Sequence, residues 1–117
     1  MASKTINFSF RILNLKPKIF DQFCKLAIIE RIYYRVGRSW NDPKRFVVLW
    51  PFFQKMPSQR VMNFIKKHQI QPTDYGIFIS LSTSKKSEEI KLPRNILSFY
   101  RRFGGQIDFS YIFIEER

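Results

Sequence analysis

The chain has 117 residues, which fits one domain and allows a core to be buried without disulfide or metal support. Its 44% hydrophobic and 17% aromatic content excludes a disordered basic tail, and the single cysteine, Cys24, excludes an intramolecular disulfide. The formal net charge of +12 favours an acidic partner, either a nucleic acid or an acidic protein surface.

The charge is unevenly distributed along the chain. Residues 1–71 hold 14 Lys and Arg against three acids, a local net of +11, whereas residues 72–117 hold 7 against 6, a local net of +1. A field of this kind speeds the encounter with an oppositely charged partner but costs self-repulsion. The alternative explanation is compositional, because an AT-rich genome also enriches Lys, Ile, Phe and Asn.

The first half of the chain predicts three strands and one helix. Residues 6–12 alternate between apolar and polar side chains, which indicates a half-buried strand. Pro17 suits the first turn of a helix that runs to about Ala27. The β-branched and aromatic residues of 28–36 predict a second strand, and the apolar run 46–50 predicts a third.

The second half predicts two helices and two strands. A helix begins at Pro57-Ser58 and ends near His68, and an alternating strand follows at 76–82. A polar loop leads to a helix over 92–103, with Gly104 as its C-cap. In the final strand, 107–114, Phe109 is expected to point into the core together with Ile107, Tyr111 and Phe113.

These elements predict a single α+β domain over residues 1–117, in the order β-α-β-β-α-β-α-β. The first six elements match the split βαβ, or ferredoxin-like, arrangement. Helices would then pack on one face of a mainly antiparallel sheet and leave the other face open.

The densest basic and aromatic cluster lies between the second and third predicted strands. The expected partner-binding residues are Arg31, Tyr33, Arg35, Arg38, Trp40, Lys44 and Arg45. In a strand, the first three would share one face, where guanidinium groups pair with phosphate or carboxylate and a ring between them stacks. The alternatives are a solvated strand face for the first three and, for Trp40, a plug at one end of the core.

Catalytic and metal-binding patterns are absent from the sequence. His68 is the only histidine and has no Ser or Asp at a spacing that suggests a triad, and one His with one Cys does not make a zinc site unaided. Gly104-Gly105 lacks the spacing of a phosphate-binding loop. We therefore expect no catalytic residues, no metal and no cofactor.

The location is predicted from three features. The N-terminal residues contain no apolar signal-peptide core, no apolar run reaches the length of a membrane span, and Cys24 suits a reducing compartment. The expectation is a cytoplasmic protein without a membrane partner.

Residues 75–114 resemble a family of small, uncharacterised bacterial domains in which a strand precedes an apolar helix, a Gly-containing stop and a final alternating strand. The matching stretch reads Ile90-Lys91-Leu92-Pro93 and then Asn95 to Phe109, with Gly104-Gly105 as the stop; Gly37 and Trp40 match an earlier turn. Such domains are similar to immunity proteins, which neutralise a toxin by docking on it. The resemblance implies a protein partner and no catalytic residues.

Two functions are therefore predicted. The first is a non-enzymatic inhibitor of the immunity type, which docks its basic and aromatic surface on an acidic patch or active site of a partner such as a toxin. The alternative is a nucleic-acid-binding module that uses residues 31–45.

Overall fold

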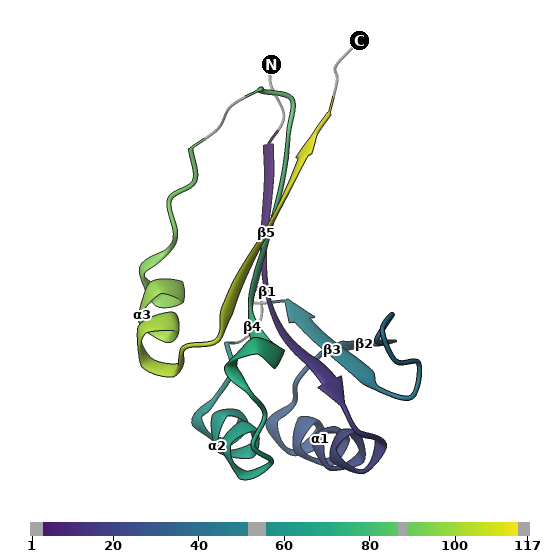
Figure 1. Ribbon diagram of the computed structural model, residues 1–117. Helices are drawn as coiled ribbons and strands as arrows, with labels where there is room; N and C mark the ends of the chain where they lie inside the picture. Colours follow the sequence, from purple (N-terminus) through teal and green to yellow (C-terminus); the bar gives the residue numbers. More distant parts are fainter. Residues whose placement is uncertain (1–3, 52–55, 87–88, 115–117) are drawn as a thin grey trace.

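A computed structural model of the chain describes residues 4–51, 56–86 and 89–114. The elements are, in order, β1 (Lys4–Leu15), α1 (Pro17–Glu30), β2 (Arg35–Arg38), β3 (Phe46–Pro51), α2 (Gln59–Lys67), a 3-10 helix η1 (Pro72–Asp74), β4 (Tyr75–Thr83), α3 (Arg94–Phe103) and β5 (Gln106–Phe113). The predicted α+β class is confirmed, in an elongated molecule of 48 × 32 × 24 Å (Figure 1).

The five strands form one mixed sheet in the order β2-β3-β1-β4-β5. Neighbours pair antiparallel except β4 and β5, which run parallel. Parallel neighbours require a crossover connection, and α3 supplies it between these two strands. The edges of the sheet are therefore the short β2 and the longer β5.

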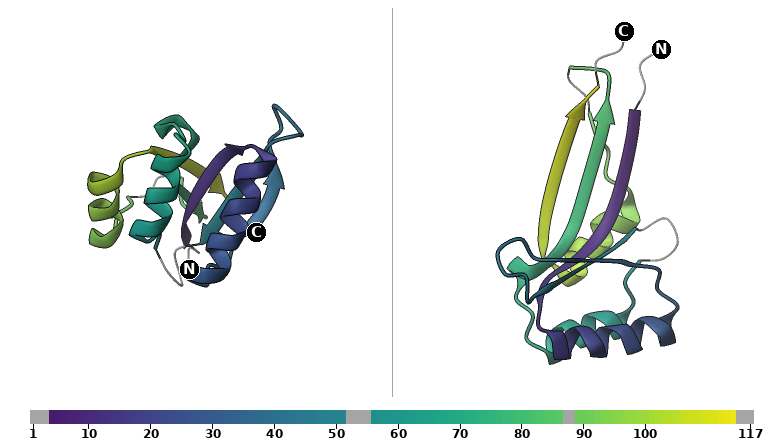
Figure 2. Two further views of the ribbon diagram at one scale, coloured as in Figure 1. Left: turned by 90° about the horizontal axis from the view of Figure 1, so that it is seen from below. Right: turned by 90° about the vertical axis from the view of Figure 1, so that its right-hand side faces the viewer.

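The core lies on one face of this sheet. Phe10 of β1 is opposite Trp50 of β3 and Ile77 of β4, so these three side chains share a face. All three α-helices contribute rings or aliphatic groups to it. Ring pairs that join helix to sheet include Phe10–Phe99 at 5.6 Å and Phe23–Trp50 at 6.1 Å between centroids. On the opposite side, no described helix covers β1, β4 and β5 (Figure 2, right).

Local signals explain where β1 and α1 begin and end. The pairing of β1 with β3 shifts register between Ile12 and Leu15, and Asn14 within this bulge has a φ of 63°, a conformation that Asn tolerates. Pro17 begins α1, as predicted, because its missing N–H has no partner in a first helical turn.

The predicted strand over residues 28–36 is wrong. The α1 helix continues to Glu30, and Arg31 then closes it with a φ of 55°. Ile32 donates its N–H to the carbonyl oxygen of Ala27 at 2.9 Å. This bond is typical of an α-helix that ends with one residue in the left-handed conformation. Burial of Phe23 and Ala27 on one helix face outweighs the β propensity of the following isoleucines, so β2 contains only Arg35–Arg38.

The expected burial of Phe109 is also wrong. Phe109 leaves 52% of its surface exposed, and Ile107, Tyr111 and Phe113 are exposed as well. These residues lie beside the buried Ile77, Ile79 and Leu81 of β4, on the same face. However, Phe99 of α3 packs toward Phe10 at the centre of the sheet, and the upper part of β5 projects beyond the helices (Figure 1).

Candidate binding surface

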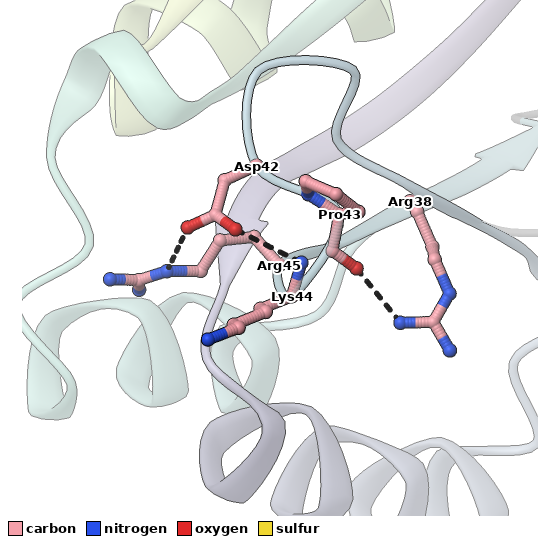
Figure 3. Close-up of polar contacts among 5 residues, drawn as sticks. All are labelled: Arg38, Asp42, Pro43, Lys44 and Arg45. Carbon is pink, nitrogen blue, oxygen red and sulfur yellow. Dashed lines mark hydrogen bonds and ion pairs between the residues drawn. The ribbon is translucent and has the colours of Figure 1, made fainter.

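The turn between β2 and β3 is held by polar contacts around Asp42 (Figure 3). The Asp42 carboxylate lies 3.6 Å from Nε of Arg45 and accepts the backbone N–H of Lys44 at 3.0 Å. Arg38 donates from its guanidinium to the carbonyl oxygen of Pro43 at 2.9 Å. These contacts fix the conformation of the turn.

The turn uses some of the predicted binding residues for its own structure. Arg38 also lies over the ring of Phe46, 4.9 Å from its centroid, and Arg45 is half-buried in its ion pair. Lys44 is exposed, and Trp40 leaves 93% of its surface exposed. Trp40 therefore does not plug the core, and it is available to a partner.

The start of α1 brings two further lysines to this turn. A hollow of about 640 Å³ is lined by Lys16, Pro17, Lys18, Ile19, Asp42, Lys44 and Arg45, and we call it the basic hollow. Four of these seven residues are cationic, and Asp42 is the one acid. Lys44 and Arg45 were predicted as binding residues, whereas Lys16 and Lys18 were not.

The electrostatics of the basic hollow favour an anionic ligand. Lys16 is the N-cap of α1 and Lys18 lies in the first turn, which contains no acid. The N-terminus of a helix carries a partial positive charge, so cations there are unfavourable unless an anion compensates them. An acidic group of a partner would relieve this repulsion. The sequence feature that could have identified Lys16 and Lys18 as binding residues is their position on either side of Pro17, at the start of a predicted helix.

The predicted stripe of Arg31, Tyr33 and Arg35 on one strand face is not formed. Arg31 is the C-cap of α1, Tyr33 lies in the connection that follows, and Arg35 alone belongs to β2. The hollow beside Arg31 and Tyr33 has a volume of about 10 Å³, which suits at most one water molecule. Arg35 is opposite Leu49 on the face that the helices leave open.

The open face carries a contact between a cation and an aromatic ring that the sequence did not predict. The guanidinium carbon of Arg11 lies 3.4 Å from the ring centroid of Phe78, in a cation–π contact between β1 and β4. Burial lowers the pKa of Arg11, while the carboxylate of Asp108 acts in the opposite direction. Both residues belong to the rows of β1 and β4 that face away from the core, and pairing them requires the register of the sheet.

His68 and Cys24 have structural surroundings. His68 caps the end of α2, with its ring 4.6 Å from that of Phe64, and no described group bonds its buried Nε2. Tyr34 donates its hydroxyl to Sγ of Cys24 at 3.3 Å, and Cys24 is half-buried. That hydrogen bond, aided by burial, raises the pKa of Tyr34 to about 12.

Comparison of the chain with protein-family models, with curated proteins and with solved structures found no match. Within the described ranges, no group of three or more His, Cys, Asp or Glu side chains is placed to hold a metal ion. None of the described helices combines the length and apolarity needed to cross a membrane.

Proposed function

We propose that this chain is a non-enzymatic binding protein that docks the basic hollow and the adjoining turn on an acidic patch or active site of a partner protein. The observation that carries this proposal is the gathering of Lys16, Lys18, Lys44 and Arg45 around one hollow. Complementary charge speeds association and selects partners. Trp40, at 93% exposure in the adjoining turn, is a residue type enriched among interface hot spots.

The surroundings of the hollow favour a protein over a nucleic acid. Pro17 and Ile19 give it apolar surface beside the charges, which suits an acidic protein segment. Nucleic-acid-binding sheets of the split βαβ type stack bases on strand aromatics. Here the inner strand β3 presents Val47 and Leu49 to the open face, and Arg11 of β1 covers the ring of Phe78. The nucleic-acid alternative is supported by Trp40, because its exposed ring, in the same turn as Lys44, suits a stacked base.

We also propose a ferredoxin-like unit, an immunity-type role and a cytoplasmic setting for this chain. The order β2-β3-β1-β4, antiparallel throughout and linked by α1 and α2, fits a ferredoxin-like unit to which α3 and β5 are added. An immunity-type role against a toxin rests on the resemblance of residues 75–114. A cytoplasmic setting rests on the free thiol of Cys24.

The experiment compares affinity capture by three forms of the protein from nuclease-treated extracts of its source cells. The parent is set beside Lys18→Glu/Lys44→Glu, which reverses two charges of the basic hollow. The matched control is Lys85→Glu/Lys86→Glu, which makes the same change in net charge at exposed positions after β4. Circular dichroism confirms that all three are folded.

The expected result is an acidic protein that the parent and the control capture and the Lys18→Glu/Lys44→Glu variant loses, with direct binding confirmed on the purified pair. In parallel, anisotropy is measured with labelled single-stranded and duplex oligonucleotides over a range of salt concentrations. Micromolar binding with a steep salt dependence, weakened by the Lys18→Glu/Lys44→Glu variant, would replace the proposal with the nucleic-acid alternative. Equal capture by all three forms would contradict docking of a partner protein through this hollow.

A further inference from the structure

The two edges of the sheet are built differently. β2 spans four residues, Arg35–Arg38, with an arginine at each end. β5 spans eight residues, Gln106–Phe113, and contains no Lys, Arg or Pro. Soluble proteins protect an exposed edge by keeping it short or by placing charges or prolines on it. β2 has this protection, whereas β5 is twice as long and carries a single charged residue, Asp108.

β5 exposes apolar side chains, four on the face of its odd-numbered residues and Ile112 on the other face. The exposed surface is 40% for Ile107, 52% for Phe109, 40% for Tyr111, 50% for Ile112 and 45% for Phe113. The odd-numbered residues continue the row of buried side chains on β4 at the same level of the sheet. The core face of the molecule is therefore incomplete at this edge.

The backbone of β5 has hydrogen-bonding groups directed away from β4. Ile114 donates its N–H to the carbonyl oxygen of Thr83 at 2.8 Å, which places the N–H of even-numbered residues toward β4. Because successive residues of a strand alternate, Ile107, Phe109, Tyr111 and Phe113 direct their N–H and C=O groups outward. No described strand accepts or donates to them.

We infer that β5 pairs antiparallel with β5 of a second copy of this chain, joining two five-stranded sheets across a two-fold axis at Ser110. A two-fold axis perpendicular to the sheet keeps the core faces of both copies on the same side. Odd-numbered residues of one β5 then lie opposite odd-numbered residues of the other, and even-numbered residues lie opposite even-numbered ones. The register with Ser110 opposite itself sets Phe109 opposite Tyr111 and Ile107 opposite Phe113. It also forms hydrogen-bonded pairs from all four outward-facing residues.

Charge and area favour a second copy at this position. Asp108 is the one charged residue in β5, so two molecules of net charge +12 meet here with little local repulsion. Aromatic side chains carry about 150–250 Å² each, so the three half-exposed rings of two copies expose on the order of 500 Å². With the isoleucines, this approaches the roughly 1,000 Å² found in specific interfaces. We therefore expect a dissociation constant in the micromolar range.

Sedimentation equilibrium of the full chain over a concentration series tests the association. The apparent mass should rise from 14.2 kDa toward twice that value. Phe109→Lys should raise the dissociation constant at least tenfold. Val36→Lys is the matched control, because Val36 also has 52% exposure and lies on the other edge strand; it should dimerise like the parent. A chain that remains monomeric at several hundred micromolar, or a dimer that Phe109→Lys leaves intact, would overturn the inference.

A cysteine pair tests the register in a Cys24→Ser background. Ser110→Cys places two thiols at the two-fold axis in a non-hydrogen-bonded pair, where the Cα separation suits a disulfide. Ile112→Cys is more exposed but lies opposite Asp108 of the second copy, so its two thiols are too far apart. Mild oxidation should cross-link Ser110→Cys and leave Ile112→Cys monomeric. Cross-linking of Ile112→Cys alone would contradict this register. Because the interface lies away from the basic hollow, this outcome and that of the capture experiment are independent.

Discussion

Gly76 lies where β4 meets the start of β5, and this contact leaves no space for a side chain. A Cβ at this position would lie 2.0 Å from the carbonyl oxygen of Gln106. The clash is with backbone, so relief requires the two strands to move apart. Gly76→Ala should therefore lower the free energy of unfolding by about 1–3 kcal/mol, the usual range for overpacking. Urea denaturation measures it.

Gly37 is the control for this substitution. It lies in β2, and a Cβ there meets no atom within 4 Å. Gly37→Ala should change the free energy of unfolding by no more than about 0.5 kcal/mol. Equal losses for the two variants would show that the contact between Gly76 and Gln106 is not what requires glycine.

Tyr34 links stability to pH through its bond to Cys24. A tyrosine has a pKa of about 10 in an unfolded chain, whereas the folded protein raises the pKa of Tyr34 to about 12. The folded state holds this proton more tightly, so its stabilisation is complete below pH 10 and is lost as pH rises through 12. Tyr34→Phe does not ionise. Its urea midpoint should therefore fall less steeply than that of the parent between pH 10 and 12, and parallel curves would contradict the assignment.

The N-terminus of α2 depends on Ser58, whose hydroxyl oxygen accepts the N–H of Val61 at 3.4 Å. The same hydroxyl donates to the carboxylate of Glu30, which joins the end of α1 to the start of α2. Ser58→Ala removes both contacts and should cost about 1–2 kcal/mol. Ser98→Ala, at an exposed position within α3, is the control and should be neutral. Thermal melts compare the two variants.

Edge position decides the cost of truncating an aromatic side chain. Phe99 of α3 is 6% exposed within the core, and Phe99→Ala should cost about 3–5 kcal/mol. Phe109 of β5 is half exposed, so Phe109→Ala should cost less than about 1 kcal/mol at a concentration where the chain is monomeric. Equal costs, measured by urea denaturation, would place Phe109 in a covered core.

Sequence periodicity located most elements because its signals are local. Alternation identified β1, β4 and β5, and the Pro57-Ser58 and Gly104 signals located the ends of α2 and α3. The end of α1 was missed because Arg31, rather than a glycine, adopts the left-handed conformation. The exposure of β5 was missed because alternation does not specify which strand a helix covers. The basic hollow joins α1 to a distant turn, which requires the tertiary fold.

At the scale of the whole molecule, the sheet separates two kinds of surface. The basic hollow lies between α1 and the turn that joins β2 to β3, at one side of the sheet, and the apolar edge β5 lies at the other. A dimer through β5 would therefore place its two basic hollows at the outer ends of one long sheet. Two sites held apart in this way bind a partner with two acidic patches more tightly than one site does, provided that both patches can be reached together.

The net charge of +12 should make stability depend on salt. Like charges repel within a folded chain, and at 0.1 M ionic strength interactions are screened beyond about 10 Å. Raising sodium chloride from 0.02 M to 0.5 M should therefore raise the melting temperature by roughly 4–8 °C, which corresponds to about 1 kcal/mol for a domain of this size. Lys18→Glu should raise the melting temperature at low salt and reduce this dependence, because it places an acid in the first turn of α1 among Lys16, Lys44 and Arg45. Lys85→Glu makes the same change in net charge in an exposed loop and should have the smaller effect. A melting temperature that falls with salt, or equal effects of the two substitutions, would show that repulsion in the basic hollow does not limit stability.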